Sequence, residues 1–277
     1  MTDSNSTIGA MFPDTKAVWE NFVFGNIHNQ KRLNIKKELK RIETNPILPL
    51  LRKINKEGSI FRDELSRQDE AYNFYRLSLA RFLKHLSISI RFHQGPAYKR
   101  KYRERLTSRE TKLARAFDES SKFTELDFYN CLFYSRILID RTTALARHFL
   151  SEKNKPSFTS FADQKKFFKK QKFPYGLHEE YAQYVRGQTD WFDFPLKAIR
   201  DKFLVHSGPR HMQHFGFPNG DMTDLCLIYV VPNNPNSDLS RVEMVSVSLV
   251  TLSRDLEVFL KWFAAYGKKS LSTRRPS

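Results

Sequence analysis

Apolar residues recur at intervals of three and four positions along most of the chain, the spacing that places them on one face of an α-helix. The pattern strengthens from Arg62 and stops at Gly95 and Pro96, two residues typical of a helix end. It predicts a first long helix whose apolar face carries Tyr75, Leu79, Phe82, Leu83, Leu86 and Ile90.

The same spacing predicts further helices in the middle of the chain, over residues 108–120, 124–150, 158–171, 177–186 and 191–205. In the helix over 158–171, Phe167 and Phe168 are expected to face inward and the surrounding lysines outward. The pair Gly208–Pro209 ends the helix over 191–205. A final amphipathic helix begins at Leu249 and closes near Gly267.

The pattern changes between the last two helices. Residues 225–231 and 241–247 are rich in β-branched side chains, and the turn-forming stretch PNNPNSD separates them. Two such runs around a turn predict a small β-hairpin. The expected fold class is therefore mainly α: a helical bundle with a β-hairpin before the last helix.

The expected organisation is a single helical domain over residues 61–267 with an appendage at each end. Residues 1–60 form a helical, basic extension, because short helical patterns there are interrupted by proline and glycine. This extension either packs on the main body or serves as a partner-binding arm. Residues 268–277 are expected to be a disordered basic tail.

Composition supports a folded protein in a reducing compartment. Apolar residues make up 40% of the 277 residues and include 24 Phe, enough for a sizeable core. Cys131 and Cys226 cannot build a disulfide framework. The first residues lack the features of a secretory signal, and the longest apolar run, residues 225–231, is too short to span a membrane. These features predict a cytoplasmic protein without membrane contact.

Positive charge is concentrated in four short segments. The chain carries 47 Lys and Arg against 30 Asp and Glu, and most of the excess lies in residues 31–41, 97–105, 165–172 and 268–277. Local basicity of this kind is typical of proteins that bind polyanions, because each neutralised phosphate releases condensed counterions. Within 97–105 the basic residues alternate with Tyr98 and Tyr102, which suits phosphate contact combined with base stacking. The candidate RNA-binding residues are Lys99, Arg100, Lys101, Tyr102, Arg103 and Arg210, with a merely solvated helix end as the alternative.

Several common catalytic sites are excluded by their missing motifs. The chain has no P-loop, no dinucleotide-binding glycine fingerprint, no HExxH zinc motif and no nucleophile elbow. His206, His211, His214 and Cys226 match no familiar metal-ligand spacing. We therefore expect neither a cofactor nor a metal.

The stretch LKAIRDKFLVHSGPRH contains Arg200, followed directly by Asp201, and then His206 after five intervening residues. This arrangement resembles the signature of the HEPN superfamily, in which an Arg, usually followed by Asn, Asp or His, precedes a His late in a compact helical bundle. The resemblance implies a metal-independent endoribonuclease that acts as a homodimer with two such motifs at its interface. It also implies a toxin or phage-defence role, and RNA as the substrate, either tRNA or single-stranded RNA.

The three motif residues suit cleavage at phosphorus. His206 is the natural acid or base because its ordinary pKa lies near neutrality. Arg200 would hold the phosphate with its forked donors, and Asp201 would orient or polarise either partner. Arg200 and His206 lie about 120° apart around an ideal helix, so a distorted helix end, a long reach by Arg200 or residues from two subunits must bring them together.

The alternative to an enzyme is a non-catalytic helical module that binds nucleic acid or an acidic protein partner. In that case Arg200 and Asp201 are an ordinary surface pair, and His206 is a helix-terminal residue favoured by the helix dipole. A protein partner that inhibits or activates the site is compatible with the enzyme hypothesis.

Overall fold

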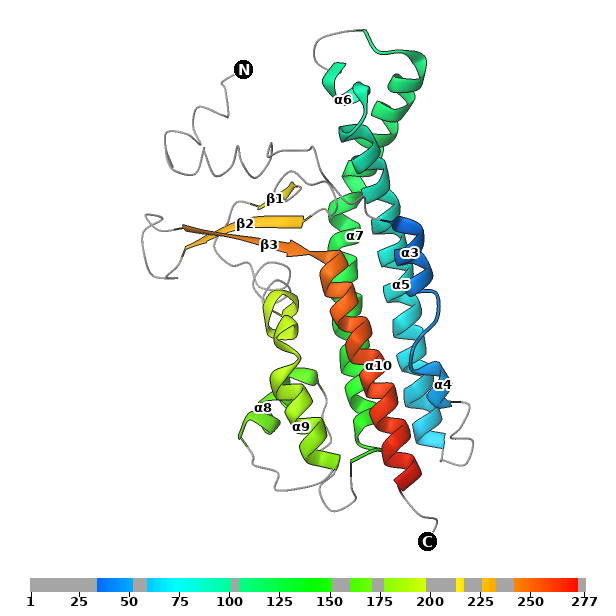
Figure 1. Ribbon diagram of the computed structural model, residues 1–277, viewed down its shortest axis with the longest axis vertical. Helices are drawn as coiled ribbons and strands as arrows, with labels where there is room; N and C mark the ends of the chain where they lie inside the picture. The colour runs from blue at the N-terminus through cyan, green and yellow to red at the C-terminus, as the bar shows by residue number, and fades with distance from the viewer. Residues whose placement is uncertain are drawn as a thin grey trace. The chain divides into compact units, whose positions relative to one another are not determined.

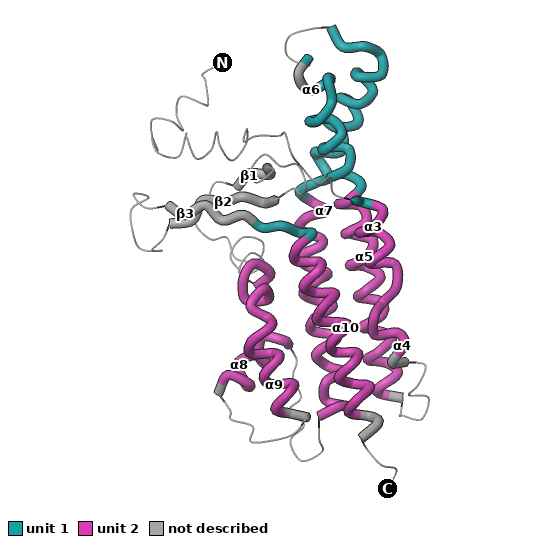
Figure 2. Tube along the Cα trace, viewed as in Figure 1, with its two compact units in different colours: residues 1–35, 84–125, 209–250 teal, residues 36–83, 126–208, 251–277 magenta. Residues whose placement is uncertain are grey.

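The computed structural model describes residues 34–51, 59–100, 105–150, 160–170, 177–197, 213–216, 226–232 and 242–273. They are mostly helical, and the predicted fold class, a mainly α bundle with a small β element before the last helix, is confirmed. The chain divides into two compact units, shown in Figure 2. Unit 1 comprises residues 1–35, 84–125 and 209–250, and unit 2 comprises residues 36–83, 126–208 and 251–277.

Three long helices run side by side in unit 2: parts of α5 (Ser59–His93), α7 (Ser108–Ala146) and α10 (Leu249–Thr273) (Figure 1). Their facing sides are buried and combine aliphatic side chains with aromatic rings. Phe82 of α5 meets Phe128 of α7 edge to face, with ring centroids 5.8 Å apart. Burial of such rings supplies most of the favourable free energy of a helical core.

The two helices predicted over 108–120 and 124–150 form one continuous helix, α7. The polar stretch between them suggested a break, but its hydroxyl groups bond back to the helix itself. Ser120 Oγ donates to the Phe117 carbonyl at 3.1 Å and Thr124 Oγ1 to the Ser120 carbonyl at 3.0 Å. A serine or threonine that bonds within its own helix does not end it, and this explains the error.

The first described residues pack on the bundle rather than extend away from it. Helix α3 (Ile35–Arg41) and the short α4 (Leu48–Leu51) lie beside α5 in Figure 1. Glu38 accepts hydrogen bonds from Arg41 (2.9 Å) and from Arg254 of α10 (2.5 Å), while Arg41 also donates to Ser253 and pairs with Glu257. These contacts tie α3 to α10 within unit 2.

Two further helices, α8 (Phe161–Lys170) and α9 (Leu177–Gly187), pack on α10 through aromatic rings. Phe161 contacts Phe259 at 5.4 Å, and the Tyr184 ring stacks on Trp262 with centroids 3.7 Å apart and planes only 6° apart. Both helices match their predicted ranges to within a few residues. The end of α8 and the start of α9 lie on either side of residues that the structure does not describe.

The helix predicted over residues 191–205 is wrong in its first part. Phe192–Lys197 form a short kinked segment, η2, which is not a continuous helix: Phe194 has an extended backbone (φ −139°, ψ 126°) and the Phe194–Pro195 peptide is cis. Pro195 has no amide hydrogen, and a proline disfavours helical geometry in the residue before it. Residues 198–212 lie outside the described part of the chain.

The predicted hairpin is confirmed within a sheet of three strands. Strands β2 (Cys226–Pro232) and β3 (Val242–Ser248) pair antiparallel, with Cys226 opposite Ser248. A strand that the periodicity did not predict, β1 (Gln213–Gly216), pairs antiparallel with the other side of β2, giving the order β1-β2-β3. Only four residues long, β1 is too short for alternation to reveal it.

Helix α10 continues to Thr273, six residues beyond its predicted end at Gly267. Gly267 does not stop the helix; a Cβ at this position would lie only 3.0 Å from the Phe149 ring. Beyond it, buried Ser270 donates a 2.7 Å hydrogen bond to the Phe149 carbonyl, and Lys269 pairs with Glu180. The expectation of a disordered tail is therefore wrong for residues 268–273, because this last turn packs on the bundle.

We expect Gly267→Ala to destabilise the protein, in contrast to the usual gain for alanine in a helix. Helix propensity favours alanine by about 1 kcal/mol, whereas overpacking costs about 1–3 kcal/mol. The Phe149 ring cannot yield because it is held edge to face by Phe263 and Phe61. Gly187→Ala is the matched control, since no atom lies within 4 Å of its added Cβ. Urea unfolding should show a loss for the first variant only; equal stability of both variants would contradict this packing.

We expect acid to weaken the attachment of α3 to α10. Burial opposes ionisation of Glu38, but the bonds from Arg254 and Arg41 outweigh it and lower the pKa of Glu38 from its ordinary 4.5. Because the pKa of Glu38 is lower in the folded state than in the unfolded state, its ionised carboxylate stabilises the fold at pH values above 4.5. This stabilisation is lost as the pH falls through the lowered pKa of the folded state. In thermal melts between roughly pH 7 and 3, Glu38→Gln should lower Tm at neutral pH and flatten its acid decline. The exposed control Glu70→Gln should keep the wild-type profile.

Candidate functional site

The motif residues Arg200, Asp201 and His206 lie outside the described part of the chain, as does Arg210. The structure describes the chain up to Lys197, only three positions before Arg200. The structure does show which contacts hold residues 192–197, the segment that leads into the motif.

Phe192 fixes the start of that segment. Its side chain is fully buried, and two cationic groups lie against its ring: the guanidinium carbon of Arg136 at 4.5 Å and the ammonium of Lys165 at 6.0 Å from the centroid. Cation–π contacts away from water contribute up to about 2 kcal/mol each. The ring is thus held by α7 and α8 together.

Arg136 also takes part in a partly buried ion pair. It donates from Nε to Asp140 Oδ2 at 2.9 Å, and Asp140 Oδ1 accepts the Phe161 amide at 2.8 Å. The Phe161 amide belongs to the first turn of α8, where helix donors have no partner within the helix. One side-chain pair of α7 therefore orders both the start of α8 and the ring of η2.

Lys165 is buried, contrary to the prediction that the lysines of this segment face outward. Its side chain is only 3% exposed, and its Nζ donates to the Thr189 carbonyl and to Asp193, both at 2.8 Å. The Thr189 carbonyl also accepts the Phe192 amide at 3.1 Å. Lys166 and Lys169 are exposed as predicted, while Phe168 faces inward. Periodicity could not predict a buried lysine here, because burial of Lys165 depends on two acceptors that lie later in the chain, the Thr189 carbonyl and Asp193.

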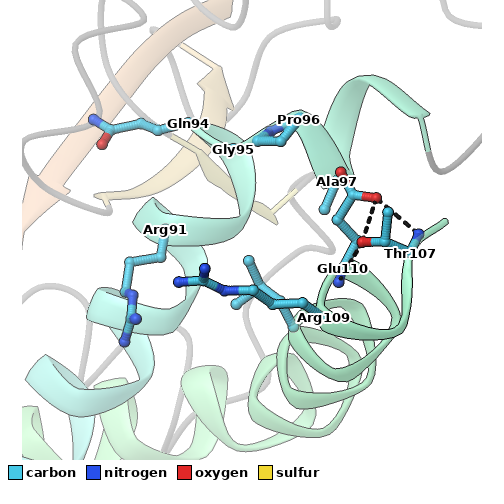
Figure 3. A pocket seen from close by; sticks show the side chains of 9 residues that line it. Arg91, Gln94, Gly95, Pro96, Ala97, Thr107, Arg109 and Glu110 are labelled. Atoms are coloured by element: carbon cyan, nitrogen blue, oxygen red, sulfur yellow. Dashed lines mark hydrogen bonds between the residues drawn. The ribbon is translucent and has the colours of Figure 1, made fainter.

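A second candidate region is the basic end of unit 1, formed by the last turns of α5, the short α6 (Pro96–Arg100) and the first turns of α7. Residues 91–112 contain eight Lys and Arg against two Glu. A cavity of about 630 Å³ opens there, and Figure 3 shows its lining residues: Arg91, Gln94, Gly95, Pro96, Ala97, Thr107, Arg109, Glu110 and Leu113.

A capping box holds one wall of this cavity. Glu110 accepts hydrogen bonds from the Thr107 amide and hydroxyl, both at 2.9 Å, and the Glu110 amide donates to Thr107 Oγ1 at 3.3 Å (Figure 3). This reciprocal arrangement satisfies donors at the start of α7. The bonds from Thr107, aided by the Arg100 guanidinium, hold the pKa of Glu110 below its ordinary value, so the carboxylate is ionised at neutral pH.

The predicted RNA-binding residues are only partly described. Lys99 and Arg100 belong to α6, whereas Lys101, Tyr102 and Arg103 lie outside the described residues. The Arg100 side chain is 42% exposed and pairs with Glu110 at 3.3 Å.

Tyr98 does not serve as the open stacking platform that the alternation with basic residues suggested. It packs edge-on against Phe92 at 5.8 Å and also contacts His93, within the small core of this end. The Tyr98 ring lies inward because α6 packs on the rings of Phe92 and Phe117, which stack with their centroids 4.3 Å apart.

Sequence reasoning missed Arg91 and Arg109, which both line the cavity. They lie 18 positions apart, on either side of the basic run 97–105. The turn that connects α5 to α7 through α6 brings Arg91 and Arg109 to the same cavity. Gly95 allows the tight turn between α5 and α6, since a Cβ there would lie 2.9 Å from the Arg91 carbonyl oxygen.

Within the described ranges, no three His, Cys, Asp or Glu side chains gather closely enough to hold a metal ion. His206 and His211 lie outside those ranges, while His214 and Cys226 belong to β1 and β2. Of the helices that the structure describes, none combines the length and the apolar character needed to cross a bilayer.

No protein-family model matches the chain, and neither the curated proteins nor the solved structures contain a match to it. The likeness to the HEPN superfamily therefore depends on Arg200, Asp201, His206 and their setting in a helical bundle.

We expect Lys165→Met to destabilise the protein by about 2 kcal/mol, the scale of a hydrogen bond to a charged group. The matched control is Lys169→Met, because Lys169 lies 3.8 Å from the same Asp193 carboxylate but its side chain is 60% exposed. An exposed pair contributes roughly 0–1 kcal/mol, so the control should remain near wild type. Chemical denaturation measures both variants, and a control as unstable as Lys165→Met would show that burial of Lys165 is not the cause.

Proposed function

We propose that the protein is a metal-independent endoribonuclease of the HEPN type. The observation that carries the proposal is the Arg200-Asp201 pair with His206 five residues beyond it, late in a chain whose fold is a helical bundle. The anchoring of Phe192 by Arg136 and Lys165 supports it, since a catalytic segment needs a fixed starting point.

In the proposed reaction the 2′-hydroxyl of a ribose attacks the adjacent phosphorus. His206 accepts the proton of that hydroxyl, or in its charged form donates a proton to the departing 5′-oxygen, and the second proton transfer falls to the other motif of a dimer or to water. The P–O5′ bond breaks, leaving a cyclic phosphate and a 5′-hydroxyl. Arg200 stabilises the charge on the pentavalent phosphate, and Asp201 orients one of the two.

RNA is the proposed substrate because the basic end of unit 1 suits a polyanion. Eight basic residues within residues 91–112 provide phosphate contacts independent of base sequence. The proposal includes tRNA or single-stranded RNA as the target, a homodimer as the active form and the cytoplasm as the compartment. It also includes a toxin or phage-defence role, with an inhibitory or activating protein as the regulator.

The second candidate function is a non-catalytic module that binds nucleic acid, or an acidic protein, through the same basic end. The observation that favours it is the place of the cavity and its arginines: they belong to residues 91–113, far along the chain from the Arg200–His206 motif. Binding alone would need only this region.

We expect His206→Ala and Arg200→Ala each to reduce RNA cleavage in EDTA by at least about 100-fold, since general acid–base catalysis contributes roughly 10²–10⁴-fold. RNA binding and the melting temperature should stay near wild type. Arg115→Ala, which removes an exposed cation from α7, is the charge-matched control and should cleave normally. The assay uses labelled tRNA and single-stranded RNA and identifies the product ends.

Cleavage that persists in both motif variants would contradict the ribonuclease proposal. If the wild type binds RNA but does not cut it, the binding module becomes the better account.

A further inference from the structure

The cavity at the basic end has two kinds of wall. Arg91 from α5 and Arg109 from α7 contribute guanidinium groups, and in Figure 3 the Arg109 side chain extends from α7 toward the turn of α5 that carries Arg91. Pro96 and Leu113 contribute apolar surface, while Ala97 beneath them is fully buried. A volume of about 630 Å³ falls within the range of small-ligand sites, roughly 300–1,000 Å³.

Both arginines are available to a ligand. Each side chain belongs to an exposed residue, and among the described residues neither forms an ion pair or hydrogen bond with the protein. Arg100, by contrast, pairs with Glu110. Two arginines from different helices that face one cavity are suited to forked hydrogen bonds with a phosphate.

Among the described residues of the cavity wall, Glu110 is the carboxylate, and it does not repel such a ligand strongly. Glu110 directs its oxygens to Thr107 and Arg100, so its charge is compensated within the wall. The amides at the start of α7 are also engaged, because the Glu110 amide bonds to Thr107 Oγ1 and the Thr111 amide to the Thr107 carbonyl. The anion would therefore be held by the two arginine side chains rather than by the helix N-terminus.

We propose that this cavity binds one nucleotide of single-stranded RNA, with its phosphate on Arg91 and Arg109 and its base or ribose against Pro96 and Leu113. A single strand fits better than a duplex, because only an unpaired nucleotide can turn its base into a pocket. The choice of RNA rests on the proposed function; the phosphate site itself rests on the cavity. Its residues are different from those of the motif, and its proposed role is to hold the substrate rather than to cleave it.

The test measures binding of a labelled single-stranded RNA of roughly 12 nucleotides at several salt concentrations. Arg91→Gln and Arg109→Gln should each weaken binding roughly tenfold, the scale of one charge-assisted hydrogen bond, and reduce the slope of log K against log salt by about 0.7. Because both side chains contact one phosphate, the double variant should weaken binding by less than the product of the single effects. Binding of a duplex of the same sequence should change less.

The matched control is Arg115→Gln with Lys122→Gln, which removes two exposed cations of α7 that do not line the cavity. Far-UV circular dichroism and melting confirm that all variants are folded. If the control pair weakens binding as much as the cavity pair, or the cavity pair leaves binding unchanged, the proposed site is wrong.

Cleavage separates this inference from the ribonuclease proposal. In an active enzyme, the cavity variants should raise KM and leave kcat near wild type, whereas His206→Ala should lower kcat and leave binding intact. An inactive wild type whose binding still depends on Arg91 and Arg109 would refute the enzyme and retain the cavity site. An active enzyme whose KM is unaffected by both substitutions would refute the cavity site alone.

Discussion

The buried guanidinium of Arg136 is the constraint on which the packing around the motif segment depends. Arg136 is only 5% exposed, and an unpaired charge at that depth would cost several kcal/mol. Its pairing with Asp140 and its contact with the Phe192 ring offset this cost. Because Asp140 also accepts the first amide of α8, the position of α8 and that of η2 are set by one pair. Lys165 of α8 adds a second cation near the same ring and is itself held by Asp193.

The basic end follows a different principle. Its scaffold is a small aromatic core, Phe92 stacked on Phe117, and a capping box that begins α7. These contacts use Tyr98 and Glu110 for structure and leave Arg91 and Arg109 for a ligand. Basic residues therefore have two roles: those paired with a carboxylate stabilise the fold, and those that line a cavity are suited to binding a ligand. In the segment before the motif, Arg136 and Lys165 belong to the first kind.

Errors of prediction arose where a local signal had two physical meanings. Ser120 and Thr124 are typical of helix ends, yet their hydroxyls bond within α7, so two predicted helices are one. Gly267 resembles a helix stop, but its missing Cβ makes room for the Phe149 ring. Pro195 was overlooked within an otherwise helical apolar pattern, and there the chain leaves helical geometry. Only for Gly267 did a residue distant in sequence decide the outcome; the hydroxyls and the proline act within their own segments.

The sequence by itself determined the helical class, the long helices and the hairpin, because burial of one face imposes a period that the residues must show. It also supplied the Arg200–His206 motif, whose recognition depends on spacing along the chain. Only the tertiary structure decided that Lys165 is buried, that α3 is tied to α10 and that Arg91 and Arg109 share a cavity. These are contacts between residues distant in sequence, and no periodicity records them because each depends on how separate helices pack.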